Sequence, residues 1–334
     1  MDNNEDQFEA AACRLLNPEG LLYHYTGQQG LLGILKDRKI WASHIRYLND
    51  TKEYYAGRSL IKRVLLLMKE LNQADEGTAK SVEETLEMFD GLDIYVASFS
   101  KAEDGGSLNL WRAYAHTLPG YSIGFSAESL NTFIRSKPNQ ELVARPEITR
   151  LYGVQYVPEL GEDYRIRREL AWLPQVLQEI ISRLKTTNLD AFFNNELYKG
   201  LPVAEIASIF KQSFDEYKKF AMILSILLPL LKHEGFMAEQ EQRIVKIRVP
   251  DDDFEHCSDL EFHGGHSSII PHLEIDLPLG DLGIRRIVVG PCPDPDWTVR
   301  VVEMLLTKNK IKIRRKGDEV GVEVIPSKIP YRNW

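Results

Sequence analysis

Two carboxylates and an arginine alternate just before a predicted strand, in the segment Glu239-Gln240-Glu241-Gln242-Arg243. Strand alternation predicts that residues 239, 241 and 243 share one side. Two carboxylates on one face raise each other's pKa, and they suit acid/base work or the stabilisation of a cationic centre. Arg243 on the same side would moderate this by pairing with one carboxylate. The alternative is a solvated edge-strand face that carries a plain Glu–Arg pair.

A second polar segment, His24-Tyr25-Thr26, ends one predicted strand and opens a helix. A strand end followed by a helix N-terminus presents free backbone N–H groups, so these three residues can hold a ligand. In the alternative, Thr26 is only the helix cap and His24 is a core histidine with its hydrogen bonds satisfied.

Aromatic residues gather in Trp111-Arg112-Ala113-Tyr114 and, after a turn, in Gly120-Tyr121-Ser122. Flat aromatic faces stack on nicotinamide, adenine or nucleic-acid bases, and Arg112 could pair a phosphate bidentately. Trp111 and Tyr114 lie three residues apart on one helix face, so packing in the core explains them equally well.

Two further groups of residues have simpler explanations. Asn49-Asp50 with Glu53 fits an ordinary helix start. Cysteine and histidine also cluster between residues 256 and 272, and imidazole and thiolate suit zinc, but the spacing matches no standard zinc motif and Gly264-Gly265 indicates a hairpin loop. The members of this cluster are His256, Cys257, His263, His266 and His272.

The elements that position these residues follow from the pattern of apolar residues. Strands are predicted at 40–43, 93–99, 121–125, 152–157, 244–249, 269–275, 284–289, 310–313 and 320–325. Helices are predicted from Gln28, from Asp50, over 80–90, around Trp111, after Ser126 and near 296–307. Thr26 and Ser126 are the predicted caps of their helices. We therefore expect an α+β fold with a mixed, split β-sheet core, formed by an N-terminal α/β part (1–160) and a C-terminal β-rich part (236–334), with a large helical insertion (161–235) between them.

Composition narrows the class of protein. The chain has 334 residues, 43% of them hydrophobic and 27% charged, as is ordinary for a globular protein with a full core. A net charge of -8 argues against a general nucleic-acid-binding surface. Three cysteines are too few for a disulfide framework, and neither a signal peptide nor a membrane span is recognisable, so we expect a cytoplasmic protein with no membrane association.

Several common catalytic templates are missing from the sequence. It contains no Walker phosphate loop, no dinucleotide G-x-G-x-x-G after a strand and no G-x-S-x-G nucleophile elbow. Their absence disfavours kinases, GTPases, Rossmann dehydrogenases and α/β-hydrolases.

With these motifs in view, most of the chain resembles the bacterial domain-of-unknown-function family 2971. The segments that carry the resemblance are L-Y-H-Y-T at 22–26, G-I-L-K-D-R-K-I-W-A-S at 33–43, Y-L-N-D-T-K-E at 47–53, S-F-S at 98–100, W-R-A-Y at 111–114, G-Y-S-I-G-F-S at 120–126, F-M-A-E-Q-E-Q-R-I-V at 236–245, I-V-V-G-P at 287–291 and I-P-Y-R at 329–332. The resemblance is weakest over 163–235.

A second, weaker resemblance is to ADP-ribosyltransferases, including those that modify DNA bases. His24-Tyr25-Thr26 with Leu31 to Leu35 is similar to their opening strand and helix, and Glu241 (or Glu239) to their strand-entry catalytic glutamate. The resemblance implies an ADP-ribosyltransferase-like core. Two departures are the long stretch between the middle strand and the glutamate, and Arg243, which is not part of the transferase pattern.

The resemblance also implies roles for single residues. His24 would hold a ribose of NAD and Tyr121 would stack on nicotinamide, with Tyr25, Thr26, Trp111, Arg112 and Ser122 completing the NAD site. Glu241 would bind a hydroxyl of the nicotinamide ribose and help to activate the acceptor. Catalysis would therefore rest on Glu241, Glu239 and His24, with no metal.

The expected function is NAD cleavage with transfer of ADP-ribose to a protein or nucleic-acid acceptor, as in a bacterial antiviral-defence or toxin effector with a possible inhibitory partner. One alternative is a non-catalytic binding or sensor module of a defence system. Another is a metal-dependent hydrolase or nuclease that uses the cluster between residues 256 and 272.

Overall fold

The computed structural model describes residues 18–48, 52–70, 93–101, 108–114, 119–136, 148–157, 226–248, 259–265, 268–278 and 282–329. The chain divides into two compact units: residues 1–14, 50–92 and 157–233 form one, and residues 15–49, 93–156 and 234–334 form the other. The predicted helix over 80–90 and most of the predicted insertion 161–235 lie outside the described residues, so the three predicted domain ranges stay predictions.

The first unit contains helix α3 (Lys52–Glu70), a 3₁₀ turn (Leu228–Leu230) and strand β7 (Leu231–His233). The buried residues Leu60, Ile61 and Val64 give α3 its apolar face at the helical spacing. Gly57 brings the helix close to the 3₁₀ turn, because a Cβ there would lie 3.0 Å from the Leu228 carbonyl oxygen.

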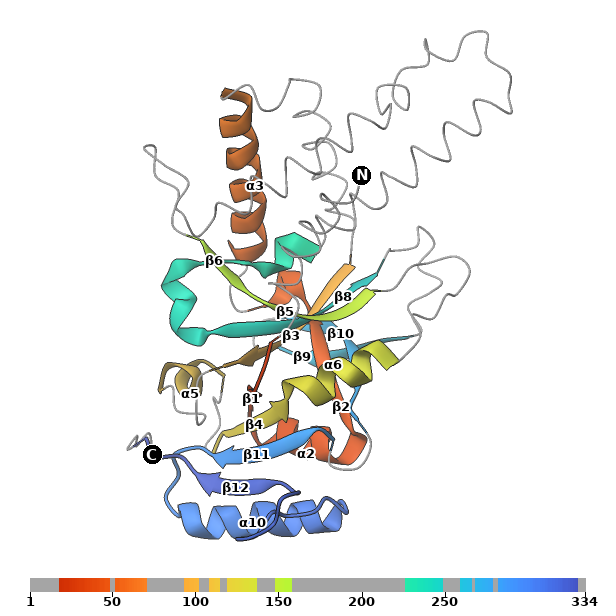
Figure 1. Ribbon diagram of the computed structural model, residues 1–334, viewed down its shortest axis with the longest axis vertical. Coiled ribbons are helices and arrows are strands. Elements are labelled where there is room, and N and C mark those ends of the chain that lie inside the picture. Colours follow the sequence, from red (N-terminus) through yellow and green to blue (C-terminus); the bar gives the residue numbers. More distant parts are fainter. Residues whose placement is uncertain are drawn as a thin grey trace, which may run out of the picture. The chain divides into compact units, whose positions relative to one another are not determined.

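The second unit holds the elements of the candidate site (Figure 1). Its helices are α2 (Gln28–Asp37), α5 (Leu108–Tyr114), α6 (Ala127–Ser136) and α10 (Pro295–Lys308), with 3₁₀ segments at Ile45–Tyr47 and Glu234–Glu239. Its strands are β1 (Leu21–Thr26), β2 (Lys39–His44), β3 (Asp93–Ser100), β4 (Tyr121–Ser126), β5 (Ile148–Gly153), β8 (Glu241–Arg248), β9 (Leu260–Gly264), β10 (Ile269–Asp276), β11 (Ile284–Val289) and β12 (Glu323–Pro326), and β6 (Gln155–Val157) follows β5 at the boundary between the units.

In the described part of the chain these ten strands, β6 excluded, form one sheet with the order β12-β11-β4-β1-β3-β2-β10-β9, and β8 pairs with both β3 and β5. The β11–β12 pair is parallel, and the other pairs are antiparallel. This mixed, mostly antiparallel sheet with its helices confirms the predicted α+β class. The finer expectation of an ADP-ribosyltransferase-like core stays a prediction.

One face of the sheet carries the large hydrophobic core and is called the core face below. Helices α2, α6 and α10 supply apolar residues to it, among them Leu35, Leu130 and Leu306. In α2 the buried residues Leu31, Ile34 and Leu35 recur every three or four positions, so one stripe of the helix meets the sheet. Figure 1 shows α10 running along β12, the strand at one edge of the sheet.

Three predicted details differ from the structure. Residues 310–313 form no strand, because Ile313 makes only an isolated bridge to Val322. The predicted strand 152–157 is interrupted at Val154, whose N–H turns to the carbonyl of Glu241. Strand β9 was not predicted, since its exposed and polar residues hide the strand pattern. No helix in the described ranges is long and apolar enough to cross a membrane.

Candidate functional site

The register of three neighbouring strands decides which predicted site residues share a face. Glu241 of β8 lies opposite Ser100 of β3, and Ser100 lies opposite Tyr23 of β1. Opposed residues of an antiparallel pair share a face, and neighbours along a strand alternate between faces. Glu241 therefore lies on the same face as Tyr23 and Tyr25, which we call the carboxylate face, and His24 lies on the core face.

The same rule divides the residues of β4. Tyr121 pairs with Thr26 and so lies on the core face with His24, whereas Ser122 pairs with Tyr25 on the carboxylate face. The structure thus brings Tyr25, Ser122 and Glu241 to one side of the sheet. It places His24, Thr26 and Tyr121 on the other side.

His24 is held on the core face by its neighbours in β3. Its ring contacts Phe99, with ring centroids 5.8 Å apart, and its Nδ1 lies 3.0 Å from the carbonyl oxygen of Ser98. A carbonyl only accepts hydrogen bonds, so Nδ1 carries the proton. Burial lowers the pKa of His24, and the bond to Ser98 opposes this only in part. His24 is therefore a neutral imidazole with Nδ1 already committed.

Tyr121 and Thr26 also belong to the architecture of the core face. Tyr121 is part of the main hydrophobic cluster, and burial raises the pKa of its hydroxyl, with a smaller contribution from Cys292. The prediction that Thr26 caps α2 is wrong, because the N-cap is Gly27 and has no side-chain bond. The hydroxyl of Thr26 instead occupies the space that a Cβ at Gly30 would need.

On the carboxylate face, α5 packs an aromatic pair onto the sheet. The rings of Trp111 and Tyr25 meet edge to face, with centroids 5.0 Å apart, in a small hydrophobic cluster that includes Leu110 and Val288. Trp111 is buried and Arg112 is exposed. Trp111 therefore packs in a hydrophobic core, which is the alternative that the sequence left open.

Two polar atoms on the carboxylate face, one on each side chain that neighbours Tyr25, have no hydrogen-bond partner among the described residues. They are Nε1 of Trp111 and Oγ of Ser122, and both are buried. Buried polar atoms in folded proteins are almost always bonded to protein, water or a ligand. These two atoms therefore mark a place on the carboxylate face where a small polar group would be favoured.

Glu241 and Arg243 form a buried ion pair within β8. Arg243 donates from Nε to Oε1 of Glu241 over 2.7 Å and from Nη2 to Oε2 over 2.9 Å. The two residues are 4% and 1% exposed. The predicted pairing is confirmed, but the solvated-edge alternative is wrong, because β8 lies between β3 and β5. Arg243 compensates the charge of Glu241 at short range.

Glu239 lies in a different backbone setting from Glu241. It ends the 3₁₀ segment Glu234–Glu239, and Gln240 has a left-handed φ of 46°, so strand alternation does not extend back to it. The prediction that residues 239, 241 and 243 share a strand face is therefore wrong for Glu239. Its carboxylate accepts a hydrogen bond from the Tyr114 hydroxyl at 3.3 Å (Oε2), and its carbonyl accepts one from Ser100 Oγ at 2.6 Å.

Three residues that were not predicted as site residues support this arrangement. Ser100 and Tyr114 hold Glu239, and the N–H of Glu241 donates to the Tyr156 hydroxyl over 2.6 Å. Tyr114 and S-F-S at 98–100 do appear in the motifs above, but their partners are far away in sequence. A single sequence gives no signal for such contacts.

Of the cysteine and histidine cluster that was considered as a zinc-site alternative, His256, Cys257 and His266 lie outside the described residues. Within the described ranges, no group of three or more His, Cys, Asp or Glu side chains is placed to hold a metal ion. His263 and His272, however, are in contact.

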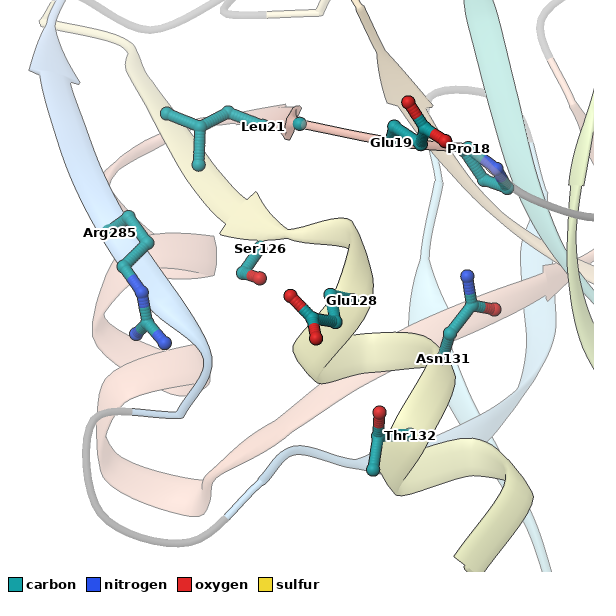
Figure 2. Close-up of a pocket in the computed structure, with 9 residues that line it drawn as sticks. Pro18, Glu19, Leu21, Ser126, Glu128, Asn131, Thr132 and Arg285 are labelled. Carbon is teal, nitrogen blue, oxygen red and sulfur yellow. The ribbon is translucent and has the colours of Figure 1, made fainter.

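A polar cleft of about 660 Å³ lies beside the start of α6 (Figure 2). The residues that line it include Glu19, Glu128, Asn131 and Arg285. Ser126, which directly precedes α6, also lines the cleft, and the Ser126 hydroxyl accepts a hydrogen bond from the N–H of Ser129 at 3.2 Å. None of the predicted site residues lines this cleft. Its mixed charges single out no class of ligand.

No protein-family model matches this chain, and neither a curated protein nor a solved structure matches it. The resemblances seen in the sequence therefore stay hypotheses.

Proposed function

We propose that this protein is an ADP-ribosyltransferase-like enzyme that cleaves NAD and transfers ADP-ribose to a macromolecular acceptor, as an effector in bacterial defence. The observation that carries the proposal is the pair of carboxylates at the entry of β8. Glu241 lies on the carboxylate face of the sheet, and Glu239, which precedes the strand, accepts a hydrogen bond from Tyr114 of α5. Breaking the bond between nicotinamide and ribose creates an oxocarbenium-like centre, and a fixed carboxylate stabilises such a charge electrostatically.

The two carboxylates would have different roles. Glu241 is fixed by Arg243, so its charge is largely compensated, and it suits a hydrogen bond to a ribose hydroxyl. Glu239 is bonded by the neutral phenol of Tyr114 and is only half-buried. We therefore assign the stabilisation of the developing positive charge to Glu239.

The carboxylate face carries hydrogen-bonding groups of the kinds that could bind NAD. Trp111 Nε1 is a hydrogen-bond donor and Ser122 Oγ is a donor and acceptor, and both are buried beside the ring of Tyr25. A carboxamide or a sugar hydroxyl would satisfy them. His24 and Tyr121 lie on the core face, so the proposal gives them no direct contact with NAD.

The test is nicotinamide release by the purified chain, with and without protein or nucleic-acid acceptors. We expect Glu239→Gln to lower the rate by about 10²–10³-fold, the usual effect of losing one electrostatic group in a transition state. Because Glu239 lies outside the buried ion pair, the unfolding midpoint of the Glu239→Gln variant should stay near that of the wild type. Glu128→Gln, an exposed change on α6, serves as the matched control. A wild-type chain that neither releases nicotinamide nor transfers ADP-ribose would refute the proposal.

A non-catalytic binding module is the second candidate. It is favoured by the closed Glu241–Arg243 pair, because Arg243 already bonds both carboxylate oxygens of Glu241 without a substrate. Binding of NAD without turnover, measured by calorimetry and unaffected by Glu239→Gln, would support this second function over the first.

A further inference from the structure

Two histidines meet at the far end of the sheet, outside the proposed NAD site. The hairpin of β9 and β10 pairs His263 with Ile270, and His272 lies two residues further along β10. The two histidines therefore lie diagonally on the same face of neighbouring strands. Their Nδ1 atoms face each other at 3.1 Å.

Packing holds both imidazole rings in place. The Trp41 ring of β2 lies over them, with its centroid 4.2 Å from that of His272 and 5.0 Å from that of His263. His272 is 2% exposed, whereas Trp41 is 48% exposed. The pair is thus covered from one side by Trp41, and His263 is its more exposed member.

The facing nitrogens have the spacing of two ligands on one metal ion. Zinc–imidazole bonds are about 2.0–2.1 Å long, so two nitrogens on one ion lie roughly 2.9–3.4 Å apart for angles between square-planar and tetrahedral. The separation of 3.1 Å, which here is that of a hydrogen bond between the two rings, falls in this interval, and a bound metal ion would take the place of the proton between the two nitrogens.

We propose that His263 and His272 are two ligands of a binding site for a divalent transition-metal ion such as Zn²⁺. Glu261 is the cross-strand neighbour of His272 on the same face and is exposed, so rotation of its side chain would supply a third ligand, and water would complete the site. The inference does not depend on the proposed NAD chemistry, because neither histidine belongs to that site.

The experiment is titration of the metal-free, full-length chain with Zn²⁺ and, separately, Ni²⁺ by calorimetry. A second measurement follows the tryptophan fluorescence of the chain, to which Trp41 contributes. We expect one equivalent of metal to bind, and His263→Gln or His272→Gln to weaken binding at least 10-fold, about the minimum seen even for residues that only support metal ligands. Glu261→Gln should weaken it less. His233→Gln, a histidine outside the pair, should bind like the wild type.

Because His272 is buried, the His272→Gln variant could fail to fold, so a further measurement compares unfolding midpoints with and without metal. A ligand that binds only the folded chain raises the unfolding midpoint, so Zn²⁺ should raise it in the wild type and in His233→Gln but not in His263→Gln. His263 is only half-buried, so this variant should fold. Absence of binding by the wild type, or equal binding by His263→Gln, would overturn the proposal.

Discussion

Arg243 holds both carboxylate oxygens of Glu241 from two residues along the same strand, in a site almost closed to water. Such a pair is costly to desolvate, and it persists because each charge satisfies the other. Removing one partner leaves an uncompensated buried charge. Any loss of activity in a Glu241 variant therefore has to be separated from loss of stability.

The first prediction concerns this ion pair. Glu241→Gln and Arg243→Met should each lower the free energy of unfolding by about 3–5 kcal/mol, the range for breaking a buried pair from one side. The double variant should lose clearly less than the sum of the two single losses, because no unpaired charge remains. Urea unfolding of the four proteins measures the coupling, and strictly additive losses would show that the two side chains do not interact.

The second prediction concerns the dependence of stability on pH. Burial lowers the pKa of His24 below the ordinary value of 6.5, so the unfolded chain binds this proton at a higher pH than the folded chain. The free energy of unfolding should therefore be undiminished above about pH 6.5 and fall as the pH drops below this value. His263 and His272 are shifted in the same direction and add to the slope.

His24→Gln isolates the contribution of one histidine, since the Gln amide can still donate to the carbonyl of Ser98. Denaturant unfolding between pH 7.5 and 5 should give a shallower slope for this variant than for the wild type or for His233→Gln. Equal slopes would mean that His24 is protonated equally in the folded and unfolded chains.

Sequence periodicity was sufficient for the local elements. The apolar spacing in Leu31, Ile34 and Leu35 predicts α2, and the β-branched residues within Ile284–Val289 predict β11, because each pattern reports burial along one short segment. The Glu241–Arg243 pair was also accessible, since both residues lie on one strand.

The face assignments required long-range information. Tyr114 is 125 residues from Glu239, and Ser100 is 139 residues from it, so nothing local announces either contact. The position of Glu239 was predicted from strand alternation, and the left-handed backbone of Gln240 interrupts that alternation. The side of the sheet occupied by His24 followed only from strand register.

The third prediction tests how closely Trp111 is packed. A Cβ added at Gly290 would lie 2.8 Å from both the Gly120 carbonyl oxygen and Trp111 Cζ3. Since backbone and a buried indole leave little room to adjust, Gly290→Ala should cost about 1–3 kcal/mol, as overpacked cores do. Gly264→Ala meets nothing within 4 Å and should change the unfolding midpoint little. A Gly290→Ala protein as stable as the wild type would show that the aromatic pair is loosely held.

The last prediction concerns the place of Thr26 on α2. A Cβ at Gly30 would lie 1.9 Å from Thr26 Oγ1 and 3.1 Å from Thr26 Cβ, whereas a Cβ at Gly33 would meet only Asp37 Oδ2, at 4.0 Å. Alanine is favoured over glycine inside a helix by about 1 kcal/mol, so Gly33→Ala should stabilise the protein. Gly30→Ala should destabilise it instead, because Thr26 has to leave its position. In a Thr26→Ala background the hydroxyl at 1.9 Å is gone and only the 3.1 Å contact with the Cβ of residue 26 remains, so Gly30→Ala should cost less there than in the wild type, which urea unfolding of the four combinations would detect. If Gly30→Ala stabilised the wild type as much as Gly33→Ala does, the Thr26 side chain would be free to move, and its fixed position above the first turn of α2 would be refuted.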